Sequence, residues 1–269
     1  MIKIKNFKEQ LMQQGDFTKV AKHYHNRPAY SEMLLRKLVR CVNDENRSLC
    51  DLQVVEVGAG TGKFTKMLSD MGMKVLAVEP NDNMREEGMK YTQNTTIKWQ
   101  NGSGEDTGVE SGFADWVIMA SSFHWTDPKK SLPEFARILN SRGGGAYFTA
   151  IWNPRNIIEG SVFDEIEKEI KDIVPELNRV SSGKQNTKKW EEILISTRDF
   201  VDCFFMECDY EEVMSKERYL GAWESVNDIQ AQAGQERWKK ILSMIESKVQ
   251  HLNEIVIPYK IRAWTARKK

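Results

Sequence analysis

The sequence predicts an α/β protein built on a doubly wound, mostly parallel sheet. Two observations carry this prediction. Between residues 31 and 151, short runs rich in β-branched residues alternate with amphipathic helical segments, and a glycine-rich turn follows the first of these runs. Strands that alternate with helices need crossover connections, which make neighbouring strands parallel. The 269 residues are 40% hydrophobic and 29% charged, a composition that can bury a core.

The elements of the first half follow from hydrophobic spacing. Residues 31–42 and 61–71 carry apolar side chains at helical intervals, and Gly72 ends the second of these helices. Residues 53–57 are a β-branched run that ends at Gly58, which is typical of a buried strand. Further strands are expected at 74–79, 96–99, 115–120 and 146–151, and further helices at 84–91 and 132–139.

The strict alternation breaks in the second half. Helices are expected at 163–174, 188–196, 219–227 and 236–249, and strands at 204–208 and 255–266. We interpret these strands as the closing strands of the same sheet. The helices between them are insertions that could cover a pocket.

Composition and charge exclude several classes of function. Lys+Arg and Asp+Glu both number 39, so the basic excess typical of a nucleic-acid binder is missing. The four cysteines form no C-x-x-C pair and the histidines do not lie at zinc-ligand spacing, so no metal site is predicted. Residues 1–14 do not read as a signal peptide, and no apolar run is long enough for a membrane helix. We expect a soluble, cytoplasmic protein.

The turn after the first strand reads E-V-G-A-G-T-G and comprises Glu56 and the loop 58–62, with Gly58, Ala59, Gly60 and Gly62. Glycines let a backbone turn sharply and approach a ligand closely, and the next helix presents free N–H groups there. Seventeen residues after Gly62, Glu79 ends the second strand, where a carboxylate can accept hydrogen bonds from two ribose hydroxyls.

The spacing of this loop separates two classes of nucleotide ligand. A dinucleotide fingerprint is G-x-G-x-x-G, whereas this loop is G-x-G-x-G. Glu56, two residues before the first glycine, can receive the ammonium group of an amino-acid moiety, and a pyrophosphate needs no such partner. The pattern therefore favours a nucleoside joined to an amino acid.

These motifs resemble class I S-adenosylmethionine-dependent methyltransferases. The resemblance rests on E-V-G-A-G-T-G-K at 56–63, A-V-E-P at 77–80, G-S-G-E at 102–105 and A-D-W-V at 114–117. Three further segments are similar to the small-molecule branch of this family, which includes type 11 and trans-aconitate-like enzymes. They are S-F-H-W-T-D at 122–127, R-I-L at 137–139 and the opening Y-x-x-x-R-P-x-Y-like element at 21–30. The resemblance covers about residues 17–153 and implies a seven-stranded Rossmann-like sheet with helical lid insertions.

The resemblance also implies roles for particular residues. Glu56 and the loop 58–62 would face the methionine part of the cofactor, and Glu79, followed by Pro80, would bind the ribose. Met84 would pack near the adenine, and Ser103, Gly104 and Glu105 would lie along its edge. Ala120 and Ser121 would lie near the sulfonium and the methyl group, while Arg27 and Tyr30 would close over the amino-acid end. Asp106 departs from the family pattern, which leaves the adenine contact open between Glu105 and Asp106.

The sequence says less about the residues that would contact the methyl acceptor. His124 follows the fourth strand and is a candidate general base, or a histidine that only shapes the pocket. Candidate substrate contacts in the N-terminal segment are His23 and Tyr24. Those that follow strands are Phe123, Trp125 and Trp152, and the alternative role of these aromatic side chains is core packing.

The resemblance thus predicts one methyltransferase domain over residues 1–269. It would comprise a helical lid segment (1–45), a cofactor-binding core (46–152), a helical insertion (153–200) and closing strands with a further insertion (201–269). The expected reaction is in-line methyl transfer from S-adenosylmethionine to a small-molecule acceptor, with S-adenosylhomocysteine as product. A nucleotide-linked oxidoreductase and a non-catalytic cofactor-binding module are the alternatives. Residues 121–124 lack the N/D-P-P-Y-like element of nucleic-acid amine methylation, and the acceptor and oligomeric state are not predicted.

Overall fold

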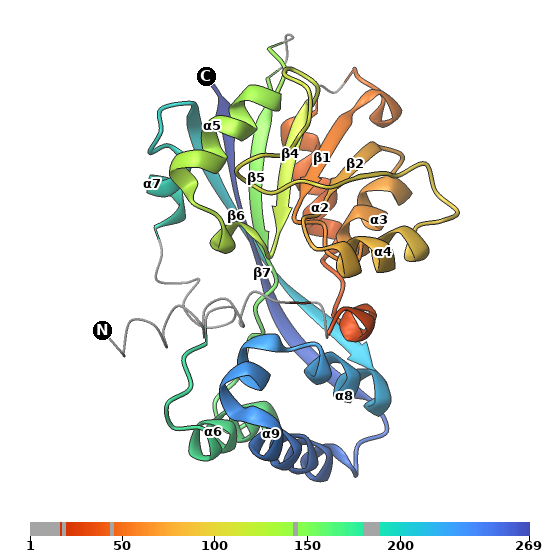
Figure 1. Cartoon of the computed structure of the whole chain (residues 1–269), viewed down its shortest axis with the longest axis vertical. Helices are drawn as coiled ribbons and strands as arrows, with labels where there is room; N and C mark the ends of the chain where they lie inside the picture. Colours follow the sequence, from red (N-terminus) through yellow and green to blue (C-terminus); the bar gives the residue numbers. More distant parts are fainter. Residues whose placement is uncertain (1–16, 18–19, 44–45, 142–144, 180–188) are drawn as a thin grey trace. The chain divides into compact units, whose positions relative to one another are not determined.

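The chain forms a seven-stranded, mostly parallel sheet (Figure 1). The computed structural model describes residues 17, 20–43, 46–141, 145–179 and 189–269. The strand order is β3-β2-β1-β4-β5-β7-β6, with β1–β5 parallel and β7 antiparallel to β5. The strands are β1 (Gln53–Val57), β2 (Lys74–Val78), β3 (Lys98–Gln100), β4 (Trp116–Ala120), β5 (Tyr147–Trp152), β6 (Phe200–Met214) and β7 (Ile255–Lys268). The predicted fold class is confirmed, and the late strands close the same sheet.

Helices connect the strands and fill the second half of the chain. They are α2 (Glu32–Val42), α3 (Lys63–Asp70), α4 (Asp82–Tyr91), α5 (Pro128–Ile138), α6 (Val162–Ile173), α7 (Trp190–Leu194), α8 (Lys216–Glu224) and α9 (Asn227–Val249). Three short 3-10 helices are η1 (Ala21–Asn26), η2 (Leu49–Asp51) and η3 (Phe123–Trp125). None of the helices in the described ranges is both long enough and apolar enough to cross a bilayer.

Several boundaries differ from the expected ones because capping residues act before the apolar pattern begins. Helix α5 starts at Pro128 rather than at residue 132, since the Asp127 side chain accepts from the Lys129 N–H and proline suits the first turn. Helix α8 starts at Lys216 rather than at residue 219 because Ser215 caps it. Strand β6 extends well beyond the expected 204–208, and most of its exposed residues are acidic.

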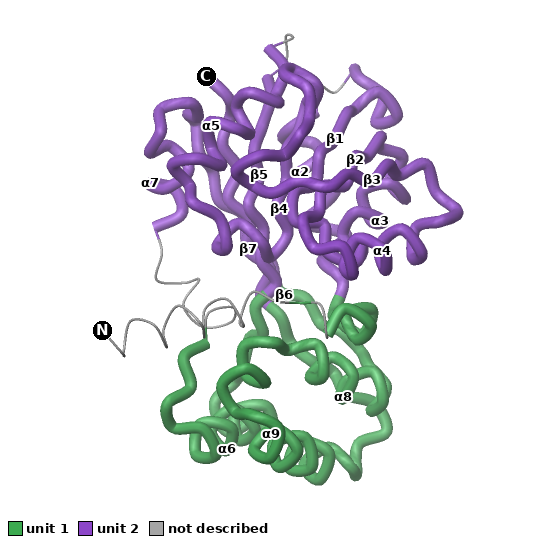
Figure 2. Tube along the Cα trace, in the orientation of Figure 1, with its two compact units in different colours: residues 1–28, 154–185, 209–259 green, residues 29–153, 186–208, 260–269 purple. Residues whose placement is uncertain are grey.

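The chain divides into two compact units (Figure 2). Unit 2 comprises residues 29–153, 186–208 and 260–269, and it contains β1–β5 with helices α2–α5 and α7. Unit 1 comprises residues 1–28, 154–185 and 209–259, with η1, α6, α8 and α9. Strands β6 and β7 each have residues in both units. The segment expected as an N-terminal lid is divided between the units after Pro28.

Each unit has its own hydrophobic core. In unit 2, the buried strands pack against Phe123, Phe135 and Phe148, whose rings lie 4.8–6.4 Å apart. In unit 1, the apolar face of α6 packs with Trp223 and with Ile241 and Ile245 of α9. Burying such side chains is the main favourable contribution to folding, at about 25 cal/mol per Å² of apolar surface.

A buried carboxylate joins β1 to β4 in unit 2. Asp115 accepts hydrogen bonds from the Gln53 N–H (2.8 Å), Asn140 Nδ2 (2.6 Å) and Arg47 Nη2 (2.6 Å). Burial would raise the pKa of Asp115, but the bonds from Arg47, Gln53 and Asn140 outweigh it and hold this pKa below its ordinary value. The start of the two central strands is therefore fixed by a charged group with a full set of partners.

We expect Gly88→Ala to destabilise the protein although alanine favours helices. An added Cβ would lie 2.1 Å from Cη2 of Trp99, and this indole is held by its bond to Thr92 Oγ1 (2.9 Å). Overpacking costs about 1–3 kcal/mol, which exceeds the helix-propensity gain of about 1 kcal/mol. Urea unfolding measures the difference, with Glu86→Ala on the exposed side of α4 as the control. Stabilisation of Gly88→Ala by the full propensity gain would contradict this packing.

Candidate active site

The loop after β1 has a backbone that glycine alone adopts freely. Gly58, Gly60 and Gly62 have φ values of 70°, 58° and 77°, in the left-handed region. A Cβ at Gly58 would lie 2.7 Å from the Cβ of Ser122, which follows β4. Ser122 Oγ in turn donates to the Val57 carbonyl over 3.1 Å. The loop therefore lies directly against the end of β4, with no room for a side chain at this glycine.

Glu79 ties this loop to the end of β2. Its Oε2 accepts from the Gly60 N–H over 2.8 Å, and its Oε1 accepts from the Asn81 N–H over 2.9 Å. The side chain is 7% exposed, and burial raises its pKa although both backbone bonds and Arg85 lower it. A carboxylate has about four acceptor positions, so Glu79 retains capacity for two hydroxyl donors.

Glu56 lies beneath the loop at the penultimate position of β1. It is 1% exposed, and the hydroxyl of Thr65 in α3 donates to its Oε2 over 2.5 Å. Burial raises the pKa of Glu56 to about 8, and the nearby charge of Glu79 adds to the rise. Two carboxyl groups are thus buried on neighbouring strands, an arrangement suited to a ligand that brings donors or positive charge.

The loop after β3 is held by its own side chains. Ser103 Oγ accepts from the N–H groups of Glu105 and Asp106, each over 3.2 Å. Glu105 Oε1 accepts from the Asp127 N–H over 2.8 Å, whereas the Asp106 side chain is exposed. Gly104 is buried against Thr126, where an added Cβ would lie 2.5 Å from Cγ2. The Glu105 carboxylate therefore joins this loop to the start of α5.

Met84 packs against the glycine loop at Gly60. It is 4% exposed in α4, and an added Cβ at Gly60 would lie 3.3 Å from its Cε. Residues 80–83 separate it from Glu79, and Asn81 caps α4 by accepting from the Met84 N–H over 3.1 Å. The end of β2 and the loop after β1 are therefore packed together.

A strained residue ends β4. Ser121 has φ 55°, which is uncommon for a residue with a side chain and costs on the order of 1 kcal/mol or more. Its hydroxyl is hydrogen-bonded to the Tyr30 hydroxyl over 2.7 Å, and the Tyr30 ring packs edge-on against Phe64 at 4.8 Å. Such strain clusters at ligand sites. Two hydroxyl groups are therefore held together at the end of β4, next to Ala120.

The aromatic residues after β4 and β5 form one group in unit 2. Trp152 Nε1 donates to His124 Nδ1 over 3.1 Å, and the His124 ring lies 4.9 Å from that of Trp125. Trp190 stacks on Trp152 with ring centroids 4.4 Å apart. Phe123 is fully buried in the core between Phe148 and Trp190.

Three residues predicted for the site belong to unit 1. His23 is paired with Glu224 over 2.9 Å, and Arg27 Nη2 donates to the Ser225 carbonyl over 2.9 Å. The Arg27 guanidinium lies over the Tyr24 ring, with its Cζ atom 4.9 Å from the ring centroid. These contacts fasten η1 to α8 within unit 1. The remaining predicted site residues lie in unit 2.

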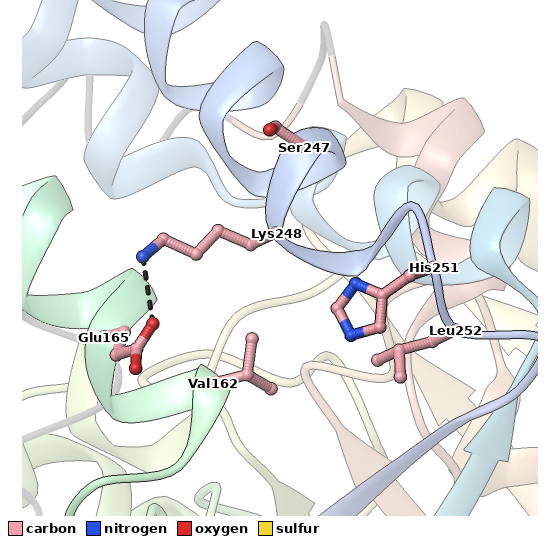
Figure 3. A pocket seen from close by; sticks show the side chains of 6 residues that line it. All are labelled: Val162, Glu165, Ser247, Lys248, His251 and Leu252. Carbon is pink, nitrogen blue, oxygen red and sulfur yellow. Dashed lines mark hydrogen bonds and ion pairs between the residues drawn. The ribbon is translucent and has the colours of Figure 1, made fainter.

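A surface hollow of about 560 Å³ also occurs in unit 1 (Figure 3). Val162 and Glu165 of α6 line one side, and Lys248, His251 and Leu252 line the other. Lys248 is already paired with Glu165 over 2.9 Å, as Figure 3 shows. This hollow contains none of the predicted site residues.

Comparison with known proteins agrees with this geometry. Residues 55–147 match a methyltransferase domain family. An uncharacterized methyltransferase of Mycobacterium tuberculosis is 35% identical over 104 residues, 39% of this chain and 41% of the relative. Both matches agree with the resemblance of this segment to S-adenosylmethionine-dependent methyltransferases. A probable S-adenosylmethionine-dependent methyltransferase of Saccharomyces cerevisiae is 28% identical over 132 residues, 47% of this chain and 44% of the relative. The matched part is less than half the length of these curated relatives.

Solved structures share the fold of the methyltransferase domain over most of the chain. A type II methyltransferase candidate from Anaeromyxobacter dehalogenans has a TM-score of 0.62 at 17% identity and covers 90% of this chain and 97% of its own. Phosphoethanolamine N-methyltransferase 2 of Haemonchus contortus, in complex with S-adenosyl-L-methionine, has a TM-score of 0.53 at 16% identity. That match covers 95% of this chain and 58% of the other. At these identities the likeness shows the fold.

Sequence reasoning missed several residues that hold the candidate site together. Thr65 binds Glu56, Ser122 packs against Gly58, and Trp190 stacks on Trp152. Thr65 and Trp190 act through contacts with residues distant in the sequence, and no local pattern marks these contacts. The one available signal was Ser122, which lies at the carboxyl end of a predicted strand, where a parallel sheet places its ligand.

The buried Glu56 gives a prediction for the pH dependence of stability. Its pKa is about 8 in the fold against an ordinary 4.5, so between these values the folded state keeps a proton that the unfolded chain has lost. The free energy of unfolding therefore falls as pH rises through this window. Relative to Glu56→Gln, the wild type should lose on the order of 1–4 kcal/mol between about pH 5 and about pH 8.5.

Urea unfolding at both pH values measures this difference. Glu86→Gln, on the exposed side of α4, is the matched control and should track the wild type. If the wild type and Glu56→Gln change in parallel with pH, Glu56 is ionised in the folded protein at neutral pH.

Proposed function

We propose that this protein transfers a methyl group from S-adenosylmethionine to a small-molecule acceptor. One observation carries the proposal. The glycine loop after β1 is bonded through Gly60 to Glu79 at the end of β2, within a matched methyltransferase domain. The relative from Saccharomyces cerevisiae that is named as a probable S-adenosylmethionine-dependent methyltransferase supports the same donor.

The residues present fit such a cofactor. Glu79 keeps two acceptor positions that a ribose diol could occupy. Glu56 is a buried carboxyl group that accepts a hydrogen bond from the Thr65 hydroxyl, and an ammonium group nearby would stabilise its ionised form. A side chain at Gly58 would collide with Ser122, which leaves bare backbone where the ligand approaches.

The chain's own contribution to the reaction is binding, orientation and exclusion of water. A bound S-adenosylmethionine supplies the activated methyl group on its sulfonium. Glu56, Glu79 and the loop 58–62 would hold the two ends of this molecule, while Met84 would cover the loop. Ser121 and His124 follow β4, where the acceptor would approach in line, and the Tyr30 hydroxyl is hydrogen-bonded to that of Ser121. The lid role expected for residues 1–45 and 153–200 stays a prediction.

Ligand binding tests the donor. S-adenosylhomocysteine should bind in a 1:1 ratio and raise the melting temperature, because a ligand of the native state stabilises it by mass action. Calorimetry and thermal unfolding with S-adenosylhomocysteine, and separately with NAD, distinguish a methyltransferase from an oxidoreductase. A larger effect of NAD would overturn the proposal. Transfer of radiolabelled methyl groups to a panel of small acids, amines and phenols then separates an enzyme from a binding module.

Glu79→Ala should weaken S-adenosylhomocysteine binding by about 10- to 100-fold. Each hydrogen bond lost to a charged acceptor costs about 1.5–3 kcal/mol of binding free energy, and water compensates part of this loss. Asp82→Ala, a nearby exposed acid that pairs with Arg85, is the matched control and should bind normally. Calorimetry and circular dichroism on the same samples separate binding from folding. Unchanged affinity in a folded Glu79→Ala protein would remove Glu79 from the site.

A further inference from the structure

The hydrogen bond between Trp152 and His124 joins the ends of two neighbouring strands. Trp152 is the last residue of β5, and His124 lies in η3 just after β4. These strands pair in parallel, so both residues lie at the edge of the sheet where ligands bind. The Trp152 Nε1 to His124 Nδ1 distance is 3.1 Å.

This bond decides which nitrogen of His124 carries the proton. The indole N–H of tryptophan is a donor and cannot accept. His124 Nδ1 must therefore be the acceptor and carry no hydrogen. In a neutral imidazole the hydrogen then lies on Nε2, which makes Nε2 a donor.

The surroundings of Trp152 keep its indole in place. Its ring stacks on Trp190 at 4.4 Å with planes 26° apart, and it packs edge-on against Trp264 at 5.5 Å. Trp152 is 1% exposed. Protonation of Nδ1 would set two N–H groups against each other without room for the indole to turn away. The environment therefore favours the neutral ring with Nε2–H.

We propose that Trp152 is a positioning residue that holds His124 as its Nε2–H tautomer, so that His124 donates a hydrogen bond to an anionic oxygen of the methyl acceptor. This inference rests on the proposed methyl transfer. A histidine whose Nδ1 is occupied and whose Nε2 is protonated cannot accept a proton from the acceptor. A nucleophile that arrives already ionised, as a carboxylate does at neutral pH, needs no such proton transfer.

The reaction balances without a base. A lone pair of the anionic oxygen forms the new O–C bond while the C–S bond breaks and its electron pair goes to sulfur. The negative oxygen and the positive sulfonium both become neutral, and no proton is transferred. The hydrogen bond from His124 Nε2–H orients the oxygen for this in-line attack.

The tautomer is measured by nitrogen-15 NMR of histidine in the full chain, with His124→Gln identifying the His124 signals. We expect the Nε2–H tautomer in the wild type at neutral pH. Trp152→Phe keeps an aromatic ring against Trp190 but removes the donor, so it should release His124 into a mixture of forms. Trp190→Phe is the matched control, because it alters the stack and keeps the donor. A wild-type His124 that carries its proton on Nδ1, or a Trp152→Phe protein with unchanged tautomer, would overturn the proposal.

Methyl transfer provides the second test, with an acceptor found in the screen above. His124→Ala should reduce kcat/KM by about 10- to 100-fold, the loss of one hydrogen bond to a charged group. His124→Gln places an amide N–H near the position of Nε2 and should recover most of the rate. Equal losses in both variants would indicate a base and contradict the donor role.

Failure of this inference is distinct from failure of the proposed function. If S-adenosylhomocysteine does not bind, methyl transfer is rejected, whereas the NMR spectrum still decides the tautomer. If S-adenosylhomocysteine binds and the acceptors are amines or alcohols that must lose a proton to His124, the anionic acceptor is rejected.

Discussion

The hydrogen bond from the Gly60 N–H to Glu79 is the contact on which the site depends. It joins the loop after β1 to the end of β2, next to the bond from the Gly58 N–H to the Val78 carbonyl (2.8 Å). The loop can make both bonds because its glycines adopt left-handed φ values. The same bonds leave the Glu79 carboxylate turned toward the loop with acceptor positions to spare. The conformation of the loop and the hydrogen-bonding capacity left for a ligand therefore depend on the same contacts.

Burying two carboxyl groups on adjacent strands is unfavourable in the protein alone. Burial raises the pKa of both Glu56 and Glu79, and the charge of Glu79 raises that of Glu56 further. A ligand with an ammonium group at one end and a diol at the other would offset this cost. Binding of such a ligand near neutral pH would then drive a proton from Glu56, so that affinity and pH are coupled through a single group.

The parts of this fold that local sequence predicts are those set by neighbouring residues. The alternation of strands and helices, the glycine loop, Glu79 and the closing strands were all visible in short windows. The full extent of β6 was not, because most of its exposed positions are acidic and acidic residues are uncommon in strands. Likewise the opening Y-x-x-x-R-P-x-Y-like element reads as one motif, yet Arg27 binds Ser225 in unit 1 and Tyr30 binds Ser121 in unit 2. Contacts between distant residues decide such assignments.

The two halves of the site differ in charge. The ends of β1 and β2 present the carboxyl groups of Glu56 and Glu79, whereas residues 120–126 after β4 include no acid and offer hydroxyl groups and the His124 ring. An anionic acceptor would be repelled by the carboxyl groups at the ends of β1 and β2 and hydrogen-bonded by the groups after β4. A cationic donor would be attracted to the ends of β1 and β2. In the proposed reaction, this separation of charge would orient both reactants along the sheet edge before any bond changes.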